Sequence, residues 1–352
     1  MSDGATPAGT IRIGKDLCTY AQTKNGWKKV KREFPESYNA IKLFKAHGNF
    51  SELIDKRNPK FLKGQLSPKE KVQGARINIL PNGKKLDKAY SLFAKNLTFH
   101  DESSHDHWDV IYQNPNGQFA YVYSLEKRKN AIKSKYKKVK LFEKKYPQLQ
   151  RKVLQALENP EDIYAVPIYT LLKTYMRVGN ELHYKVNGHK GLTTLKKKDI
   201  SINRNIAQFK YIAKSGVPMK IMQEFPSIYI KRLKETMKNA KQSDFIFTDN
   251  QKVPLKDTAF MDAFEDYCGE KFYPHIVRSY YATKKAEEFL AQHKQATKTE
   301  LKELFTSIAE KLGHKRFDKK ENEWKSNYNV TIHHYLDPVT LEKLNELTTK
   351  TK

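Results

Sequence analysis

The segment 168–200 constrains the fold more than any other part of this sequence. Apolar residues recur at three- and four-residue spacing over 168–176, which predicts one face of a buried helix. Arg177 follows this stripe directly, and Gly179 is a residue type at which helices commonly end. A glycine-punctuated connection then leads to Lys196, Lys197 and Lys198. A guanidinium fixed at a helix end beside a lysine cluster is suited to holding a phosphate, although a surface ion pair is the alternative explanation for the arginine.

The charge balance narrows the class of partner. Lysine and arginine number 66 against 39 aspartates and glutamates, a formal net charge of +27. Such an excess destabilises a compact fold by self-repulsion, and a polyanionic partner removes that cost. An aromatic share of 12%, with 20 tyrosines, argues against a disordered basic tail. No segment reaches the length of a spanning helix. We therefore predict that the partner is a nucleic acid and not a membrane.

Three further observations concern compartment and cofactors. The first ten residues lack a basic start and an apolar core, so we expect no secretory signal and an intracellular protein. Cys18 and Cys268 lie far apart and cannot form a zinc site by themselves. His100, His105 and His107 lie among acidic residues without recognised ligand spacing, so we expect no metal site and no cofactor.

Residues 1–129 predict a β-rich N-terminal domain. Short strands are expected at 10–13 and 75–80, and the runs 109–113 and 119–125 flank an Asn-Pro-Asn-Gly turn that indicates a hairpin. Tyr121 and Tyr123 alternate on the second of these strands and share a face. They are candidate DNA contacts, and a half-buried tyrosine pair is the alternative.

Composition changes sharply between 126 and 145, where ten basic residues face only two acidic ones. A basic link between two domains would draw them around a duplex by counterion release, and a solvated helix face is the alternative. Residues 130–352 follow as a second domain with a β-hairpin insert at about 199–222, which places Lys214 at the hairpin tip. Apolar periodicity then predicts helices at 229–238, 261–267, 276–292 and 299–313.

Five residues in this second domain form an ordered set: Arg177, Lys214, Arg278, His314 and Tyr335. The set resembles the catalytic pentad of type IB DNA topoisomerases, and the viral form found in poxviruses and giant viruses looks most similar. The resemblance covers about 153–344 and is most specific in RVGNE followed by NGxxGLTTLKKKDI. The Tyr-Leu-Asp-Pro that begins at Tyr335 resembles the nucleophile segment of the bacterial branch. The resemblance implies an α+β protein of the topoisomerase IB and tyrosine recombinase fold. A small β-rich lobe and a larger, mainly α-helical catalytic lobe would form a C-shaped clamp.

The resemblance also implies a reaction. Tyr335 would attack DNA and form a 3′-phosphotyrosyl link, Arg177, Arg278 and His314 would stabilise the transition state, and Lys214 would protonate the leaving 5′ oxygen. Supercoiled double-stranded DNA would be relaxed without ATP or metal by a monomer acting on one duplex. We expect DNA contacts from Lys196, Lys197, Lys198, Arg204, Tyr121 and Tyr123. If the protein is viral it would work in a virion or at a cytoplasmic replication site, and otherwise in a nucleus or nucleoid.

Two departures leave alternatives open. The insertion FDKKENEWKSNYN separates His314 from Tyr335 and makes Tyr328 a rival nucleophile, although the Tyr-Leu-Asp-Pro context favours Tyr335. The segment from His275 to Arg278 reads as the His-x-x-Arg box of tyrosine recombinases. A tyrosine recombinase is therefore the main alternative. A non-catalytic basic DNA-binding protein and a metal-dependent nuclease are the others.

Overall fold

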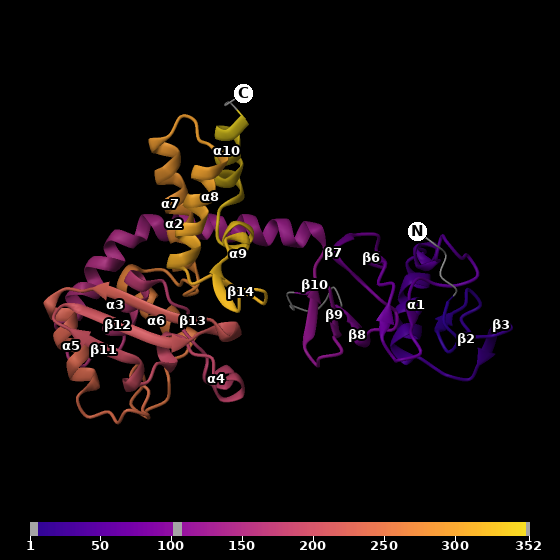
Figure 1. The fold of residues 1–352 in the computed structure, drawn as a ribbon, viewed down its shortest axis with the longest axis horizontal. Coiled ribbons are helices and arrows are strands. Elements are labelled where there is room, and N and C mark those ends of the chain that lie inside the picture. The colour runs from indigo at the N-terminus through magenta and orange to yellow at the C-terminus, as the bar shows by residue number, and fades with distance from the viewer. Residues whose placement is uncertain (1–5, 101–107, 350–352) are drawn as a thin grey trace. The chain divides into compact units, whose positions relative to one another are not determined.

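The computed structural model describes residues 6–100 and 108–349. The chain divides into two compact units, Met1–Ser134 and Lys135–Lys352 (Figure 1). Helix α2, Leu125–Ala156, is one continuous helix of 32 residues that begins in the first unit and ends in the second. The domain boundary expected at 129/130 therefore falls inside a helix.

The first unit is built mainly of short antiparallel strands and one helix, α1 (Pro35–Ala46). Its strands form a five-stranded sheet of order β3-β2-β1-β4-β5, a three-stranded sheet of order β10-β9-β8 and the pair β6-β7. Their bounds are Ile11–Ile13, Thr19–Thr23, Gly26–Val30, Gln65–Leu66, Val72–Gln73, Ile77–Ile79, Lys85–Tyr90, Lys95–Phe99, Val110–Gln113 and Phe119–Val122 for β1 to β10. The expected hairpin is confirmed, with Phe119 opposite Gln113 across the predicted turn.

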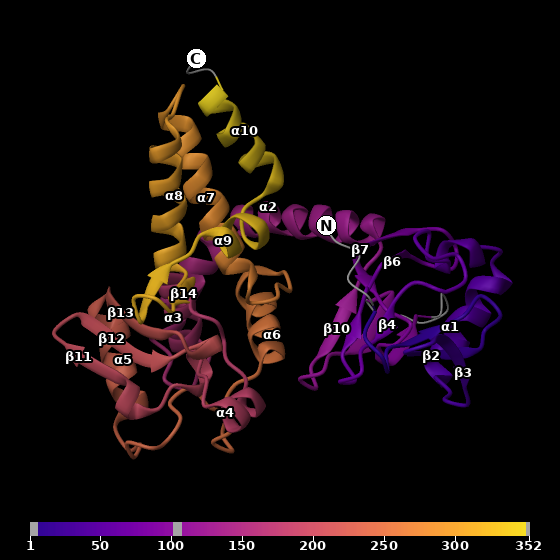
Figure 2. The ribbon, with the colours of Figure 1, turned by 45° about the vertical axis from the view of Figure 1, so that its right-hand side comes forward.

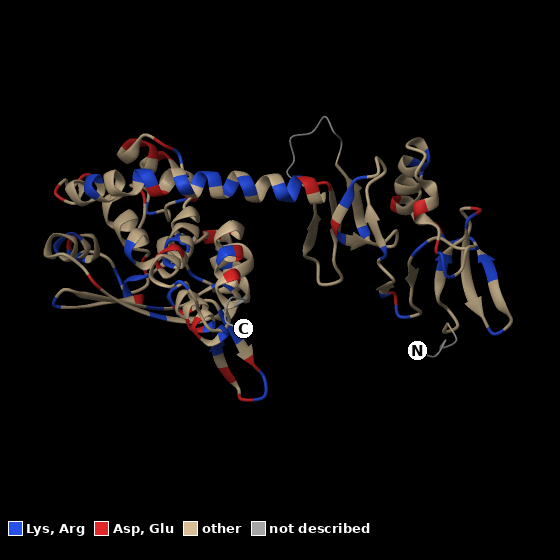
Figure 3. Cartoon of the chain, turned by 90° about the horizontal axis from the view of Figure 1, so that it is seen from above, with Lys and Arg blue, Asp and Glu red and all other residues tan. Residues whose placement is uncertain are grey.

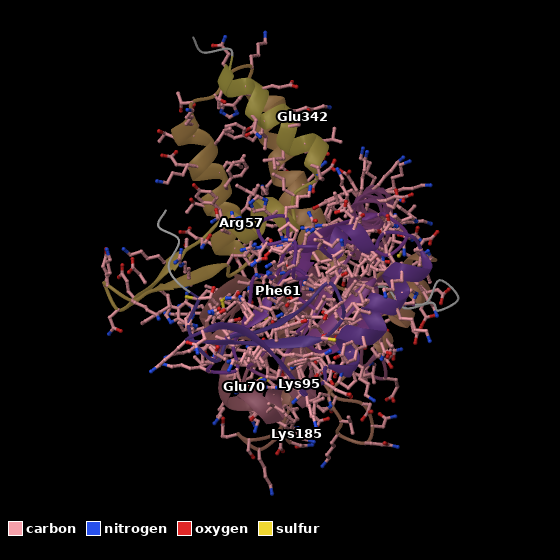
Figure 4. All side chains as sticks on the ribbon, turned by 90° about the vertical axis from the view of Figure 1, so that its right-hand side faces the viewer. Arg57, Phe61, Glu70, Lys95, Lys185 and Glu342 are labelled. Carbon is pink, nitrogen blue, oxygen red and sulfur yellow. The ribbon has the colours of Figure 1, made fainter. Side chains whose placement is uncertain are left out.

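A separate hydrophobic core holds this unit together. Phe44 and Leu53 are fully buried in it beside Tyr90. At one side, Phe61, which is labelled in Figure 4, packs against Trp27 at a ring-centroid distance of 4.6 Å. The guanidinium of Arg12 lies 4.9 Å from the centre of the same ring. The unit therefore has the burial needed for an independent domain.

The second unit is mainly helical. Its helices after α2 are α3 (Ala165–Thr174), α4 (Glu181–Asn187), α5 (Ser227–Met237), α6 (Asp257–Cys268), α7 (Ile276–Gln292), α8 (Lys298–Lys311), α9 (Asn329–His334) and α10 (Pro338–Thr349). The four helices predicted from apolar periodicity are confirmed as α5 to α8. Helix α8 starts at a capping box in which Thr297 and Glu300 satisfy each other's backbone amides. Helices α7, α8 and α10 run side by side (Figure 2).

Two β elements interrupt the helices of this unit. The predicted hairpin insert is a three-stranded sheet of order β11-β12-β13, with strands Ile200–Asn203, Ile206–Ile212 and Pro218–Glu224. The insertion after His314 forms a second hairpin, β14 (Lys315–Asp318) and β15 (Glu323–Ser326). The described residues thus form an α+β protein, as predicted.

One expectation about the opening segment is wrong. Helix α3 ends at Thr174, and Tyr175, not Gly179, takes the left-handed conformation at its C-terminus, with φ 58°. The cost of this conformation in a tyrosine is offset by packing, because the ring of Tyr175 stacks on that of Tyr281 at 4.1 Å. The helix therefore stops early because of a contact made over a long sequence distance.

The basic segment around 126–145 is a helix face. Lysine and arginine follow α2 along its length with few acidic residues between them (Figure 3). Most of these side chains are exposed, while the opposite face buries Tyr136, Val139 and Phe142 in the core of the second unit. Within the described residues, no helix combines the length and the hydrophobicity needed to cross a membrane.

Candidate active site

The phenol of Tyr335 lies in the interior of the second unit. Tyr335 directly follows α9, and its side chain is only 4% exposed because it packs on Ala282, Ile308 and Leu312. Its Oη accepts a hydrogen bond of 2.9 Å from Nη2 of Arg177 and lies 2.7 Å from Nε2 of His275. A tyrosine hydroxyl thus meets a permanent cation and an imidazole.

Arg177 is held by a backbone pairing that explains the RVGNE and NGxxGLTT motifs. The carbonyls of Arg177 and Val178 accept hydrogen bonds of 2.8 and 2.6 Å from the amides of residues 192 and 193. Gly179 and Gly191 touch at this crossing, since a Cβ on Gly191 would lie 2.6 Å from the Cα of Gly179. Only glycine permits so close an approach of two backbones.

Arg278 lies in the first turn of α7 and is 2% exposed. Its guanidinium donates to the carbonyls of Tyr175 and Leu312 and to Nε2 of His314, the last at 3.0 Å. Among the described residues, no carboxylate pairs with Arg278 or with Arg177, and Nε of Arg278 is buried without a hydrogen-bond partner. Two arginines therefore bring positive charge to this site with no protein anion to balance it.

His314 is held by partners at both ring nitrogens. Nε2 faces Nη2 of Arg278, and Nδ1 lies 2.8 Å from Oγ1 of Thr331. Because a guanidinium can only donate, we assign the proton of the neutral ring to Nδ1, which donates to Thr331. Burial, followed by the charges of Arg278 and Arg177, lowers the pKa of His314 to about 3.

His275 is a site residue that the predicted set lacked. Its Nε2 lies 3.0 Å from Nη1 of Arg177 as well as 2.7 Å from the Tyr335 hydroxyl, so both neighbours can donate to it. Burial, and then the charges of Arg177 and Arg278, lower its pKa to about 2, which keeps the ring neutral. The His-x-x-Arg box was the sequence signal that could have found it.

Lys214 is the last of the five predicted catalytic residues. It opens the turn Lys214–Gly216 between β12 and β13, the predicted hairpin tip. It lines a cavity of about 290 Å³ together with Arg177, Arg278 and His314. Tyr335 does not line this cavity, but its hydroxyl contacts Arg177, which does. The structure thus brings four of the five predicted residues to one basic cavity and places the fifth, Tyr335, in contact with Arg177, which lies 158 positions earlier in the chain.

A comparison with models of known protein families identifies the family to which this chain belongs. The family model described as "Eukaryotic DNA topoisomerase I, catalytic core" matches residues 124–337, which is more than half of the 352-residue chain. This chain belongs to the type IB DNA topoisomerase family. The match covers all five predicted catalytic residues, so the recognition made from the motifs is confirmed at the level of the family.

Solved structures similar to this topoisomerase-family chain include two recombinases. The XerH site-specific recombinase bound to palindromic difH substrate, in a post-cleavage complex, is 16% identical with a TM-score of 0.36, and the alignment covers 56% of this chain and 50% of that one. The XerA recombinase is 16% identical with a TM-score of 0.34, over 57% of this chain and 61% of that one. The chain thus spans between half and two thirds of these relatives. No curated protein matches it.

The basic residues that we expected to contact DNA in this topoisomerase-family chain differ in their contacts and exposure. The ammonium of Lys196 lies over the rings of Tyr184 and Phe245, and that of Lys197 donates to a backbone carbonyl at 2.8 Å. Lys198 is exposed, as is Arg204 in the turn between β11 and β12. Lys196 and Lys197 therefore support the local fold, whereas Lys198 and Arg204 face solvent.

The two tyrosines proposed for the first unit differ in exposure. Tyr121 is 40% exposed on β10, next to the exposed Phe119. Tyr123 is partly buried, and burial raises its pKa. Because Tyr121 is the more exposed of the two, it is better placed than Tyr123 to make a surface contact.

Two other candidates can be located. Tyr328, the rival nucleophile, packs against Phe305 in a different hydrophobic cluster, and none of its polar contacts involves Arg177. Of the predicted histidine cluster, His100 packs against Trp108, whereas His105 and His107 lie outside the described residues. No group of three potential metal ligands occurs in the part of the chain that the structure describes.

Proposed function

We propose that this protein relaxes supercoiled DNA by transient cleavage of one strand, with Tyr335 as the nucleophile of a 3′-phosphotyrosyl intermediate and without ATP or a metal ion. One observation carries the proposal. The hydroxyl of Tyr335 lies beside two arginines, one of them 2% exposed, that pair with no carboxylate among the described residues. Buried charge of this kind is costly unless an anion balances it, and a phosphodiester fits the fork of a guanidinium.

The attacking step needs a proton acceptor. Oη of Tyr335 forms a bond to phosphorus, and its proton passes to Nε2 of His275, 2.7 Å away and neutral at physiological pH. A bound phosphodiester would offset the charges of Arg177 and Arg278 and so raise the pKa of His275 towards a more useful value. Because Arg177 also donates to the phenolic oxygen, it stabilises the negative charge as it develops.

The departing step needs a proton donor. The bond from phosphorus to the 5′ oxygen breaks, and Lys214 at the hairpin tip supplies the proton that this oxygen requires. Arg278 would hold a non-bridging oxygen of the phosphorane. His314 would donate to a second oxygen from Nε2 once the bound phosphate raises its pKa and this nitrogen takes up a proton, since both residues share one side of the cavity. The phosphotyrosyl ester keeps the energy of the broken bond, so religation is the reverse reaction and consumes no ATP.

DNA is the partner that the charge distribution favours. The exposed lysines of α2 and the basic lining of the cavity would meet the phosphates of a duplex. We propose that one monomer acts on one duplex.

The test is relaxation of supercoiled plasmid with excess EDTA and no ATP. The wild type and Tyr328→Phe should relax the plasmid, whereas Tyr335→Phe should not. On a linear duplex labelled at the 5′ end of the cut strand, denaturation during the reaction should leave the label joined to the wild type, because the protein is trapped on the 3′ end at the break. Relaxation by Tyr335→Phe would move the role to Tyr328. Tight DNA binding without any relaxation by the wild type would favour the non-catalytic alternative.

A tyrosine recombinase remains the second candidate because of His275, whose contact with Tyr335 is the contact a recombinase-type box would supply. A recombinase would join strands from two different duplexes and would require several protomers. Incubation with two labelled duplexes, together with light scattering of the protein–DNA complex, separates the two. Hybrid products from a multimeric complex would replace the topoisomerase proposal, whereas relaxation by a monomer supports it.

A further inference from the structure

One lysine of the basic helix α2 differs from its neighbours. Lys133, Lys137, Lys138 and Lys140 are exposed, but Lys135 is partly buried. Its ammonium donates a short hydrogen bond to the carbonyl of His334, the residue before Tyr335. It also lies 5.5 Å from the centre of the Tyr335 ring. A side chain that reads in the sequence as one DNA contact among ten is directed into the catalytic unit.

These contacts act on the segment that carries the phenol. The carbonyl of His334 is at the C-terminal end of α9, where unsatisfied carbonyls concentrate partial negative charge, and a cation is stabilising there. The ring of Tyr335 lies near two cations, since the guanidinium of Arg278 is 5.1 Å from its centre. Lys135 therefore fixes both the backbone before the tyrosine and the ring itself.

The neighbouring residue strengthens this contact. Tyr136 is 7% exposed, and the Lys135 ammonium lies 5.0 Å from its ring. Burial raises the pKa of Tyr136. Burial lowers the pKa of Lys135 to about 8, so the ammonium stays mostly charged at neutral pH. Lys135 thus contacts both His334 and Tyr335, and its ammonium lies beside a buried ring of the same helix.

We propose that Lys135 is a positioning residue for the nucleophile, which holds the end of α9 and the Tyr335 ring so that the hydroxyl reaches Arg177 and His275. The inference rests on the proposed function, since it assigns Tyr335 as nucleophile. The orientation of the Tyr335 side chain by Lys135 can nevertheless be tested without reference to that function.

The first experiment compares Lys135→Met with Lys343→Met, which removes the same charge from an exposed position of α10. Covalent adduct on plasmid DNA is measured against time at saturating protein. Lys343→Met should cleave at the wild-type rate. Lys135→Met should still bind DNA but cleave on the order of 10²-fold more slowly, as expected for a misplaced reacting group. Lys135→Arg keeps the charge and the donors and should recover most of the loss. Equal cleavage rates for Lys135→Met and Lys343→Met would overturn the proposal.

The second experiment does not depend on catalysis. Tyrosine labelled with ¹³C at the ring carbon that bears the hydroxyl gives one signal per residue, and the Tyr335 signal is the one absent from Tyr335→Phe. Lys135→Met should shift this signal, whereas Lys133→Met should leave it in place. An unshifted signal in folded Lys135→Met overturns the positioning role whether or not the protein cuts DNA. If the wild type forms no adduct but the signal shifts, the proposed function fails and the positioning of Tyr335 by Lys135 stands.

Discussion

Oγ1 of Thr331 lies 2.8 Å from Nδ1 of His314, so the helix that precedes the tyrosine also fixes the imidazole. The backbone carbonyl of the same threonine accepts hydrogen bonds from the amides of Tyr335 and Leu336, at 3.0 and 3.2 Å. Thr331 is fully buried. One residue therefore links the orientation of His314 to the position of the phenol.

Thr331→Val tests this link, because valine keeps the shape of the side chain and removes only the hydroxyl. The ring of His314 would lose the partner that holds it, and we expect cleavage to slow by about 10-fold or more with a loss of roughly 1 kcal/mol in the free energy of unfolding. Thr170→Val is the control, since Thr170 is equally buried but bonds to Tyr229 in the core. The control should lose stability and keep its cleavage rate. Equal rates in both variants would show that Thr331 serves the fold alone.

The local part of this site could be read from the sequence. The apolar spacing of 276–292 predicts α7 and places Arg278 in its first turn, and the turn residues after β12 predict the tip that carries Lys214. These features depend on neighbours within a few positions. Helical period and turn chemistry act at that range, so one chain is enough to recognise them.

What the sequence could not supply depends on contacts between distant segments. The end of α3 was misplaced because Tyr175 is held in a left-handed conformation by Tyr281, 106 positions later. Lys135 looks like any other lysine of α2 until α9 is placed against it. His275 is separated from Tyr335 by 60 positions, so its hydrogen bond to the phenol is visible only in the folded chain.

The close contact between Gly179 and Gly191 predicts that alanine at position 191 costs more stability and activity than alanine at position 188. A Cβ on Gly191 would lie 2.6 to 2.7 Å from backbone atoms of Gly179 and Arg177, which cannot move without displacing the arginine. We expect Gly191→Ala to lower the free energy of unfolding by about 1–3 kcal/mol and to abolish most cleavage. Gly188→Ala meets no atom within 4 Å and has only its φ of +68° to accommodate, at about 1 kcal/mol. Urea unfolding and adduct formation compare the two, and full activity in Gly191→Ala would contradict this account of the motif.

The two buried histidines predict how stability depends on pH. Their pKa values, about 2 for His275 and about 3 for His314, lie below the usual 6.5, so the unfolded chain takes up protons at a higher pH than the folded one. Their contribution to stability is complete above about pH 6.5 and is lost as the pH falls towards 3. The difference in urea midpoint between pH 7 and pH 4.5 should therefore shrink in His275→Asn and in His314→Asn. An unchanged difference in both would mean that neither ring is buried in its neutral form.

The exposed lysines of α2 predict a salt effect. Lys133 and Lys137 lie one turn apart on the exposed face of the helix. If both meet phosphates, Lys133→Met combined with Lys137→Met should reduce the slope of log affinity against log salt by about 2, because each contact releases roughly one counterion. Fluorescence anisotropy with a labelled duplex over a range of salt concentrations measures this slope. An unchanged slope would show that this face of α2 is solvated and does not bind DNA.

Arg177 and Arg232 predict opposite outcomes for the same substitution. Among the described residues, Arg177 donates only to the Tyr335 hydroxyl and to His275, which also contact each other, so its loss leaves neither group without a partner. Arg232 is 9% exposed and donates to the carbonyls of Asn159 and Pro160 and to Glu235, so its loss removes three hydrogen bonds that hold these segments together.

Arg177→Met should therefore reduce cleavage by on the order of 10²–10³-fold, while its melting temperature stays level or rises because a partly buried charge without a carboxylate partner has been removed. Arg232→Met should lose about 1–3 kcal/mol of stability and cleave normally once folded. Calorimetry and adduct formation at saturating protein give both quantities. If Arg177→Met melts as early as Arg232→Met and loses activity only in proportion to its unfolded fraction, Arg177 is a structural residue. In that case its pairing with Tyr335 no longer argues for phosphate chemistry.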